Sequence, residues 1–225
     1  MIFIRQTFLI LQRDLRIEFR SKSLLLSMVI FAILFQVFLQ IAFNANTEAI
    51  QKIAPGVLWL PIFLAAMLGF NRYGTAEIEN KAIEGLLVSP IDKGAIYLGK
   101  LLGNYILVFI VIITSVPAYF LFLKQPSPNS IGLLVLVLVL GSWGFVAIGI
   151  FFTTLAQSSS ITELLVPIMI FPLAVPLFLA TVQLTEMALY PSVTMAQGLW
   201  ILMLIGYNVI FTIIPLFLFD LLLEV

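Results

Sequence analysis

The segment Gly94-Ala-Ile-Tyr-Leu-Gly99-Lys100-Leu101 comes nearest to a chemical motif by residue type and spacing. Glycines followed by a lysine are typical of loops that hold a phosphate through backbone N–H groups. Leu101, however, stands where such loops carry the Ser or Thr that binds magnesium, and no strand pattern precedes the glycines. We therefore expect a helix entering a membrane and no nucleotide site. The spacing of Gly99 and Gly103 favours close helix packing.

Two residue types that carry much of enzyme chemistry are missing, because the 225 residues include no cysteine and no histidine. This excludes disulfides, thiol redox chemistry, His/Cys zinc sites and Ser-His or Cys-His nucleophiles. The seven methionines are scattered in apolar segments and are expected to be interior filler, not haem ligands. The sequence thus predicts no enzyme activity and no cofactor or metal of its own. A net charge of zero gives no indication of nucleic-acid binding.

The charged stretch from Arg72 to Lys100 has the most readable local design. A polar helical face, with Glu77 four residues before Lys81, lies opposite an apolar one. Ser89 and Pro90 then read as the N-cap and first residue of a second helix. We expect an elbow that transmits force from a partner, or alternatively the interfacial helix common in long loops. The candidate contact residues are Glu77, Ile78, Ile83, Glu84, Leu86, Leu87, Ser89 and Pro90.

Three prolines, Pro167, Pro172 and Pro176, fall inside one apolar segment. Each proline removes a backbone hydrogen bond, which a membrane tolerates only where neighbours satisfy the freed group. The spacing predicts a bent or broken helix. Such a helix would form part of a gate or of a substrate path. Alternatively, the prolines would cause a static kink that packing against neighbouring helices holds in place.

Apolar segments long enough to cross a bilayer must position these residues. Hydrophobic residues form 62% of the chain and charged residues 10%, and a spanning helix needs about 20 apolar residues. We expect an all-α membrane protein with six transmembrane helices in a single domain, residues 1–225. The expected spans contain no charged residue and are Ser23–Phe43, Pro55–Asn71, Leu101–Leu123, Ile131–Ala156, Leu164–Leu184 and Gly198–Phe219.

The distribution of Lys and Arg predicts the orientation. Nine of the 11 basic residues lie before the first span or between the second and third, and only Lys52 and Lys124 lie on the other side. The positive-inside rule then places both termini in the cytoplasm.

We expect residues 1–22 to form an amphipathic helix at the membrane interface. Ile4, Phe8, Leu11, Leu15 and Phe19 recur at steps of three and four and make an apolar stripe. The arginines lie on another face, at a level where anionic lipid is favoured. Two roles are open for this helix: it would anchor the chain to the membrane, or it would in addition contact a partner protein.

Two motifs carry a resemblance to a known family. Gln51-Lys-Ile-Ala-Pro-Gly-Val-Leu-Trp59 and Glu77-Ile-Glu-Asn-Lys-Ala-Ile-Glu-Gly-Leu-Leu-Val-Ser-Pro90 are similar to the second-span entry and acidic loop of the CcmB family. These are the haem exporter B permeases of cytochrome c maturation. The proline-rich run Val166–Phe178 also resembles that family, and the six-span layout with an elbow resembles ABC-2-type permeases. Lys81 departs from the family, which usually has glycine there.

The resemblance implies a permease that works as a homodimer with a CcmA-like ABC ATPase. It also implies CcmC-like and CcmD-like membrane proteins and a CcmE-like haem chaperone as partners. ATP and magnesium would belong to the ATPase, haem would be cargo or partner-held, and the complex would lie in the bacterial inner membrane. The segment Glu77–Pro90 would be the contact with the ATPase.

Four other functions compete with this interpretation. An ABC-2 permease exporting a lipid, polysaccharide or drug is the nearest, but the Ala-Pro-Gly-Val-Leu-Trp stretch argues against it. A membrane scaffold that transports nothing would need no movable elbow. A membrane enzyme lacks a base, and a secondary transporter is disfavoured by uncharged spans without an inverted repeat.

Overall fold

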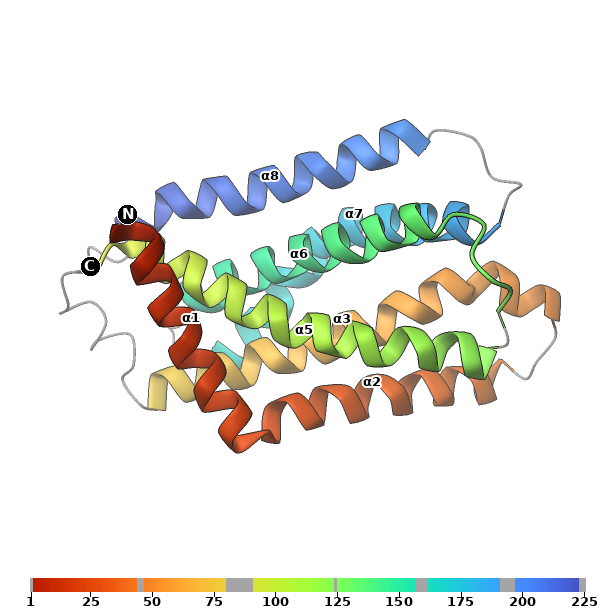
Figure 1. Ribbon diagram of the computed structural model, residues 1–225, viewed down its shortest axis with the longest axis horizontal. Helices are drawn as coiled ribbons and strands as arrows, with labels where there is room; N and C mark the ends of the chain where they lie inside the picture. The colour runs from red at the N-terminus through yellow and green to blue at the C-terminus, as the bar shows by residue number, and fades with distance from the viewer. Residues whose placement is uncertain are drawn as a thin grey trace.

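The computed structural model describes residues 2–43, 47–79, 91–123, 125–156, 162–190 and 197–222; side chains of 47–52, 71–79, 162–164 and 219–222 are outside this description. This part of the chain contains helices and no strand (Figure 1). Six of the helices are long and apolar enough to cross a membrane, which confirms the predicted all-α architecture. The helices are α1 (Ile2–Ser21), α2 (Ser23–Ala42), α3 (Thr47–Glu79), α5 (Lys93–Leu123), α6 (Ile131–Ala156), α7 (Thr162–Leu189) and α8 (Gln197–Leu222).

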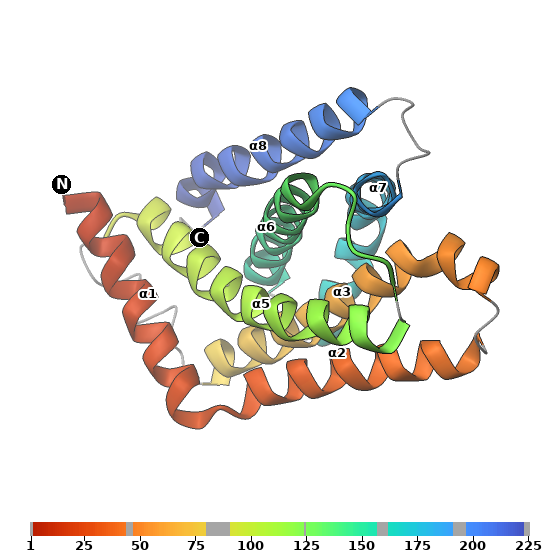
Figure 2. The same cartoon turned by 45° about the vertical axis from the view of Figure 1, so that its right-hand side comes forward.

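The six long helices run roughly side by side, and α1 crosses one end of the bundle at a steep angle to them (Figures 1 and 2). We call this end, where α1 begins and α8 ends, the α1 end. Continuous helices suit a bilayer because their backbone hydrogen bonds are satisfied within one segment. Among the described helices, α6 and α7 pack together most extensively, and α1 packs mainly on α5.

The second spanning helix is longer than its apolar residues predict. The expected span was Pro55–Asn71, but α3 runs over 33 residues from Thr47 to Glu79, and its apolar part is Ile53–Phe70. The predicted span agrees with this apolar part to within two residues at each end, and Pro55 and Pro61 both lie inside the longer helix. Helical hydrogen bonding continues through polar residues beyond the bilayer-length stretch, where hydropathy alone gives no signal.

The apolar stripe predicted on α1 is largely exposed. Ile4 is 74% exposed, Phe8 61% and Phe19 43%, while Leu11 and Leu15 are half-buried. A different row of side chains contacts the bundle, since Thr7 and Ile10 are the buried residues of this helix. The stripe is thus an exposed apolar surface, and its contact with the membrane stays a prediction. The sequence pattern did not show which face of α1 packs on the spans.

A sharp turn at Lys22 joins α1 to α2. Lys22 has a φ of 55°, a left-handed conformation that a residue with a side chain adopts at a cost. The carboxylate of Glu18 accepts a hydrogen bond from the N–H of Leu25 at 3.0 Å, which satisfies a donor in the first turn of α2. Glu18 thus stabilises the joint between the two helices.

Aromatic rings of α3, α6 and α7 form the centre of the core. The rings of Phe63 and Phe145 stack with centroids 4.0 Å apart, and Phe178 meets Phe63 edge-on at 5.6 Å. Trp59 is fully buried and packs on Phe63 at 5.4 Å. Phe70 of α3 also packs on Phe145, with ring centroids 5.7 Å apart. Gly149 of α6 permits this contact, because a Cβ there would collide with the Phe70 ring.

Hydrogen bonds between helices add specific connections to this packing. Trp59 donates its indole N–H to the Thr185 hydroxyl at 2.8 Å, which links α3 to α7. Tyr97 donates its hydroxyl to the carbonyl of Phe211 at 3.0 Å, which links α5 to α8. Gln40 of α2 donates to the carbonyl of Phe122 in α5 at 2.5 Å. In an apolar medium such polar contacts fix which helices are neighbours.

Candidate functional site

The predicted coupling elbow begins in the last turn of α3. Glu77 and Ile78 belong to that helix, which ends at Glu79, but their side chains are outside the described part of the structure. The other six candidate contacts, Ile83, Glu84, Leu86, Leu87, Ser89 and Pro90, also lie outside the described residues. Their role as a contact with an ATPase therefore stays a prediction.

The helix after the elbow begins later than expected. The sequence suggested Ser89 as the cap and Pro90 as the first helical residue, but α5 begins at Lys93. Asp92 is the cap, because its carboxylate accepts the N–H of Gly94 at 2.8 Å and of Ala95 at 3.3 Å. The earlier Ser-Pro pattern was wrong as a start signal, since Asp92 offers the same chemistry next to the first turn.

The helix α1 contacts the chain between the elbow and α5. The N–H of Asp92 faces the side-chain oxygen of Gln6 at 3.4 Å, so α1 contacts the chain just before α5 begins. Farther along, a Cβ at Gly99 would stand 2.8 Å from Ile10 and 3.1 Å from the carbonyl oxygen of Thr7. We call the contact of Thr7 and Ile10 with Gly99 the α1–α5 seam. The expected helix-packing role of Gly99 is confirmed, with α1 as its partner.

The charge of Lys100 is buried inside the protein. This residue is 1% exposed and lies two turns into α5, one residue after Gly99. The sequence predicted a helix that starts near Pro90 and continues into the third span from about Leu101, and α5, from Lys93 to Leu123, agrees with a helix that begins before that span. The sequence did not show that Lys100 would be buried.

The three prolines predicted to shape the fifth span all lie in α7, which continues as a helix through Pro167, Pro172 and Pro176. Pro172 is on the exposed side and the other two are half-buried. From the neighbouring helix α8, Tyr207 donates its hydroxyl to the carbonyl of Leu173, three residues before Pro176. A neighbour thus supports the backbone where proline weakens it. The role of these prolines in gating stays a prediction.

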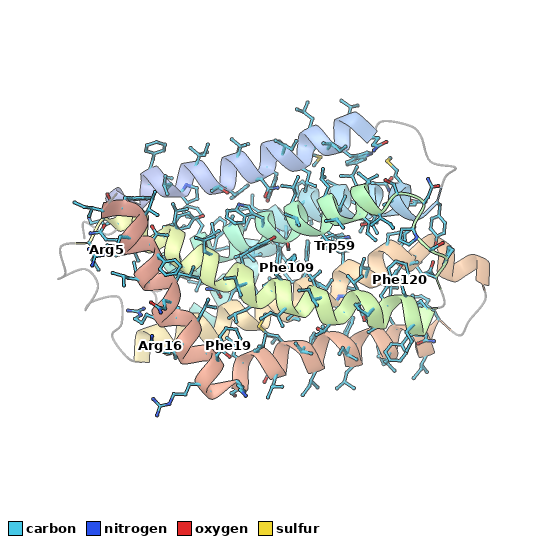
Figure 3. The ribbon with its side chains drawn as sticks, viewed as in Figure 1. Arg5, Arg16, Phe19, Trp59, Phe109 and Phe120 are labelled. Carbon is cyan, nitrogen blue, oxygen red and sulfur yellow. The ribbon has the colours of Figure 1, made fainter. Side chains whose placement is uncertain are left out.

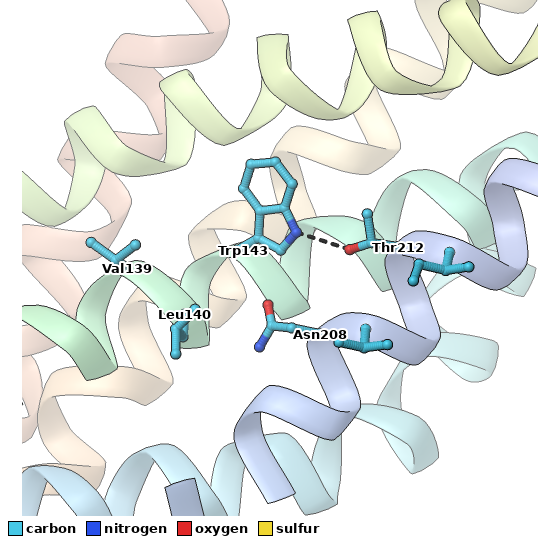
Figure 4. Close-up of a pocket in the computed structure, with 7 residues that line it drawn as sticks. Val139, Leu140, Trp143, Asn208 and Thr212 are labelled. Carbon is cyan, nitrogen blue, oxygen red and sulfur yellow. Dashed lines mark hydrogen bonds between the residues drawn. The ribbon is translucent and has the colours of Figure 1, made fainter. Parts of the chain in front are cut away.

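A groove between α6 and α8 was not foreseen from the sequence. Its volume is about 350 Å³ and its lining is mainly aliphatic (Figure 4). Inside it, Trp143 donates its indole N–H to the Thr212 hydroxyl at 2.9 Å. The lining residues are Val139, Leu140, Trp143, Asn208, Val209, Thr212 and Ile213.

Asn208 is the polar residue on the wall of this groove. Its amide N–H donates to the carbonyl of Leu204 at 2.7 Å, while its side-chain oxygen is buried and has no partner within the described residues. Gly144 of α6 makes room for it, because a Cβ there would stand 3.4 Å from the amide. The spacing of Asn208 and Thr212, one helical turn apart in an apolar span, is the sequence signal that would have found this groove.

At the end of the bundle opposite α1, Tyr190 connects the end of α7 to the segment between α5 and α6. Burial, and secondarily the nearby Glu186 carboxylate, raise the pKa of Tyr190. The hydroxyl donates to the side-chain oxygen of Gln125 at 2.6 Å. Within the described ranges no cluster of three or more His, Cys, Asp or Glu residues is placed to hold a metal ion.

These features define an integral membrane protein with six spanning helices and a further helix that crosses one end of the bundle. The sequence model of the family described as "CcmB protein" matches residues 5–224. The chain belongs to the CcmB family.

Individual relatives agree with this assignment. The chain is 27% identical over 167 residues to "Heme exporter protein B" of Rhodobacter capsulatus, which covers 74% of this chain and 76% of the relative. It is 26% identical to the protein of the same name from Pseudomonas aeruginosa, with 76% of each chain covered. The Haemophilus influenzae "Heme exporter protein B" is 24% identical, with 80% of each covered.

Proposed function

We propose that this chain is the membrane permease subunit of a complex that exports haem, or releases a haem-loaded chaperone, in cytochrome c maturation. The observation that carries the proposal is the family match over residues 5–224, together with relatives named heme exporter protein B. The missing histidine and cysteine fit a subunit that conducts or couples and performs no chemistry of its own.

A CcmA-like ATPase would supply the energy by hydrolysing ATP with magnesium. The elbow from Glu77 to Pro90 is suited to receive its movement, because it connects the end of α3 to the start of α5. Both are long spanning helices, and α1 is attached to α5 through the α1–α5 seam. Displacement of the elbow would therefore move α3 and the α1–α5 pair.

The assembly we propose is a pair of six-span units in the bacterial inner membrane. Partners would be CcmC-like and CcmD-like membrane proteins and a CcmE-like haem chaperone. Nine of the 11 basic residues favour a cytoplasmic location for both termini and for the elbow.

The orientation can be tested cleanly because the chain has no cysteine. Ser21→Cys and Ser127→Cys place single thiols at exposed positions at opposite ends of the bundle. In intact spheroplasts a membrane-impermeant maleimide should label Cys at 127 and reach position 21 only after lysis. The reverse pattern would contradict the proposed orientation.

The function is tested by isolating the tagged chain from its native host in detergent and identifying its partners by mass spectrometry. Wild type should recover an ABC ATPase with CcmC-like and CcmE-like proteins. Glu84→Arg should lose the ATPase, because a reversed charge in the elbow opposes its docking. Glu48→Arg, a matched charge reversal near the start of α3 at the other end of that helix, should retain it.

Other outcomes would reject parts of the proposal. An ATPase recovered with lipid or glycan enzymes would indicate a different exporter. Recovery of no ATPase from wild type would contradict a role as an ABC permease. Equal recovery with Glu84→Arg would leave the family role intact but would place the ATPase contact elsewhere.

A further inference from the structure

The α1–α5 seam fixes the rotation of α1 about its own axis. Because Thr7 and Ile10 lie against Gly99, α5 cannot carry a larger residue at this position. For the same reason α1 cannot rotate about its axis without a collision. Asp14 continues the same side, and a Cβ at Gly103 would stand 3.8 Å from it. The directions of the remaining side chains of α1 are therefore set by the tertiary structure.

Two different surfaces of α1 are left exposed by this docking. Arg5 and Arg16 lie on the side of α1 directed away from the bundle, whereas Phe19 lies on the side directed toward it (Figure 3). Ile4 and Phe8 share the exposed apolar stripe with Phe19. A helix at a membrane surface needs this arrangement, with apolar side chains toward the hydrocarbon and cations toward the head groups.

The arginines of α1 divide into two groups. Arg13 forms an ion pair with Asp14, with 2.9 Å between the guanidinium and the carboxylate. Arg5, Arg16 and Arg20 are exposed and form no ion pair with any described residue. Three positive charges therefore remain along the outer edge of a helix whose neighbouring edge is apolar.

From this geometry we propose that α1 binds anionic phospholipid through Arg5, Arg16 and Arg20. The charge of the three guanidinium groups is complementary to phosphate, and Arg binds phosphate oxygens through paired N–H donors. The apolar stripe of Ile4, Phe8 and Phe19 places the helix at the depth where these groups meet lipid head groups. The inference does not depend on what the complex transports.

A fluorescent label on α1 tests the proposal in the full-length chain. Gln12 is exposed and near the boundary between the apolar and basic edges, so Gln12→Cys carries a bimane label as the single thiol. The chain is reconstituted in mixed vesicles of phosphatidylglycerol and phosphatidylcholine, and one lipid at a time is brominated to quench the label. The ratio of quenching by the two brominated lipids reports local enrichment.

We expect quenching several-fold stronger by brominated phosphatidylglycerol than by brominated phosphatidylcholine at equal mole fraction. A bimane at Leu199→Cys, exposed at the start of α8, should show a ratio near one. Replacement of Arg5, Arg16 and Arg20 by Gln should bring the Gln12→Cys ratio close to one, and replacement by Lys should keep most of it. Near-surface cations contribute about fivefold each to binding of anionic membranes.

The proposal would be overturned by a ratio near one in the otherwise wild-type chain. A ratio unchanged by the three Gln replacements would also overturn it, because the preference would then come from elsewhere. Absence of quenching by either lipid, with protection of the label by an added ATPase partner, would show that this edge is a protein interface.

Discussion

The spanning stretches of α3 and α8 are similarly apolar but have opposite surroundings. In α3, 72% of the Ile53–Phe70 stretch is buried, whereas only 17% of an 18-residue window within Gln197–Leu218 of α8 is buried. Both stretches are apolar enough to span a membrane. Lipid is as apolar as a protein core, so hydropathy places a helix in the bilayer without showing whether its neighbours are lipid or protein.

The two helices differ in how tightly their side chains pack against neighbouring helices. Around α3, rings of Trp59 and Phe63 interlock with aromatic residues of α6 and α7. Along α8, the outward side chains Leu199, Leu202 and Phe217 are 66% to 71% exposed. This helix packs on α5, α6 and α7 through one side, where hydrogen bonds from Tyr97, Trp143 and Tyr207 add to the contact. The groove lies between it and α6.

The largest expected effect is loss of the Trp59 side chain. Trp59→Ala leaves a cavity beside Phe63 and removes the donor to Thr185, so the free energy of unfolding should fall by about 3–5 kcal/mol. Trp200→Ala, at a half-buried position in α8, should cost well under half as much. Thermal unfolding of the purified chain in detergent measures both. Equal losses would mean that burial differs less between the helices than we describe.

A smaller effect is expected from added volume at glycine. Gly149→Leu must displace the Phe70 ring and should destabilise the protein by about 1–3 kcal/mol. Gly206→Leu in α8 has open space around its Cβ and should have no destabilising effect. The same unfolding measurement separates the pair, and a loss at Gly206 would reveal a neighbour that α8 acquires in the assembled complex.

The smallest effect concerns the hydrogen bond beside the groove. Thr212→Val removes the acceptor of the Trp143 indole N–H, and interhelical bonds in membranes contribute about 0.6 kcal/mol on average. Thr114→Val, whose hydroxyl bonds only within α5, is the matched control. A shift of Trp143 emission in Thr212→Val alone would confirm the contact, and no shift in either would contradict it.

Only some features of the candidate site could be predicted from the sequence. The prolines of α7 and the glycine at position 99 were visible because their backbone effects depend on residue type alone. The start of α5 was misplaced because Ser89 and Asp92 are both good caps, and only the observed hydrogen bonds of Asp92 distinguish them. The groove at Asn208 was missed because the spacing of Asn208 and Thr212 marks a polar face of one helix but does not show which neighbouring helix that face meets.

By itself the sequence determined that the chain is a six-span membrane protein, because bilayer thickness and the cost of buried charge act on local composition. It also determined the chemistry that is absent, since no fold supplies a missing histidine or cysteine. The tertiary structure alone decided which apolar faces meet protein and which are left for lipid. That choice depends on close approach, as where Gly99 receives Ile10 and leaves Phe8 exposed, and such contacts join residues far apart in the chain.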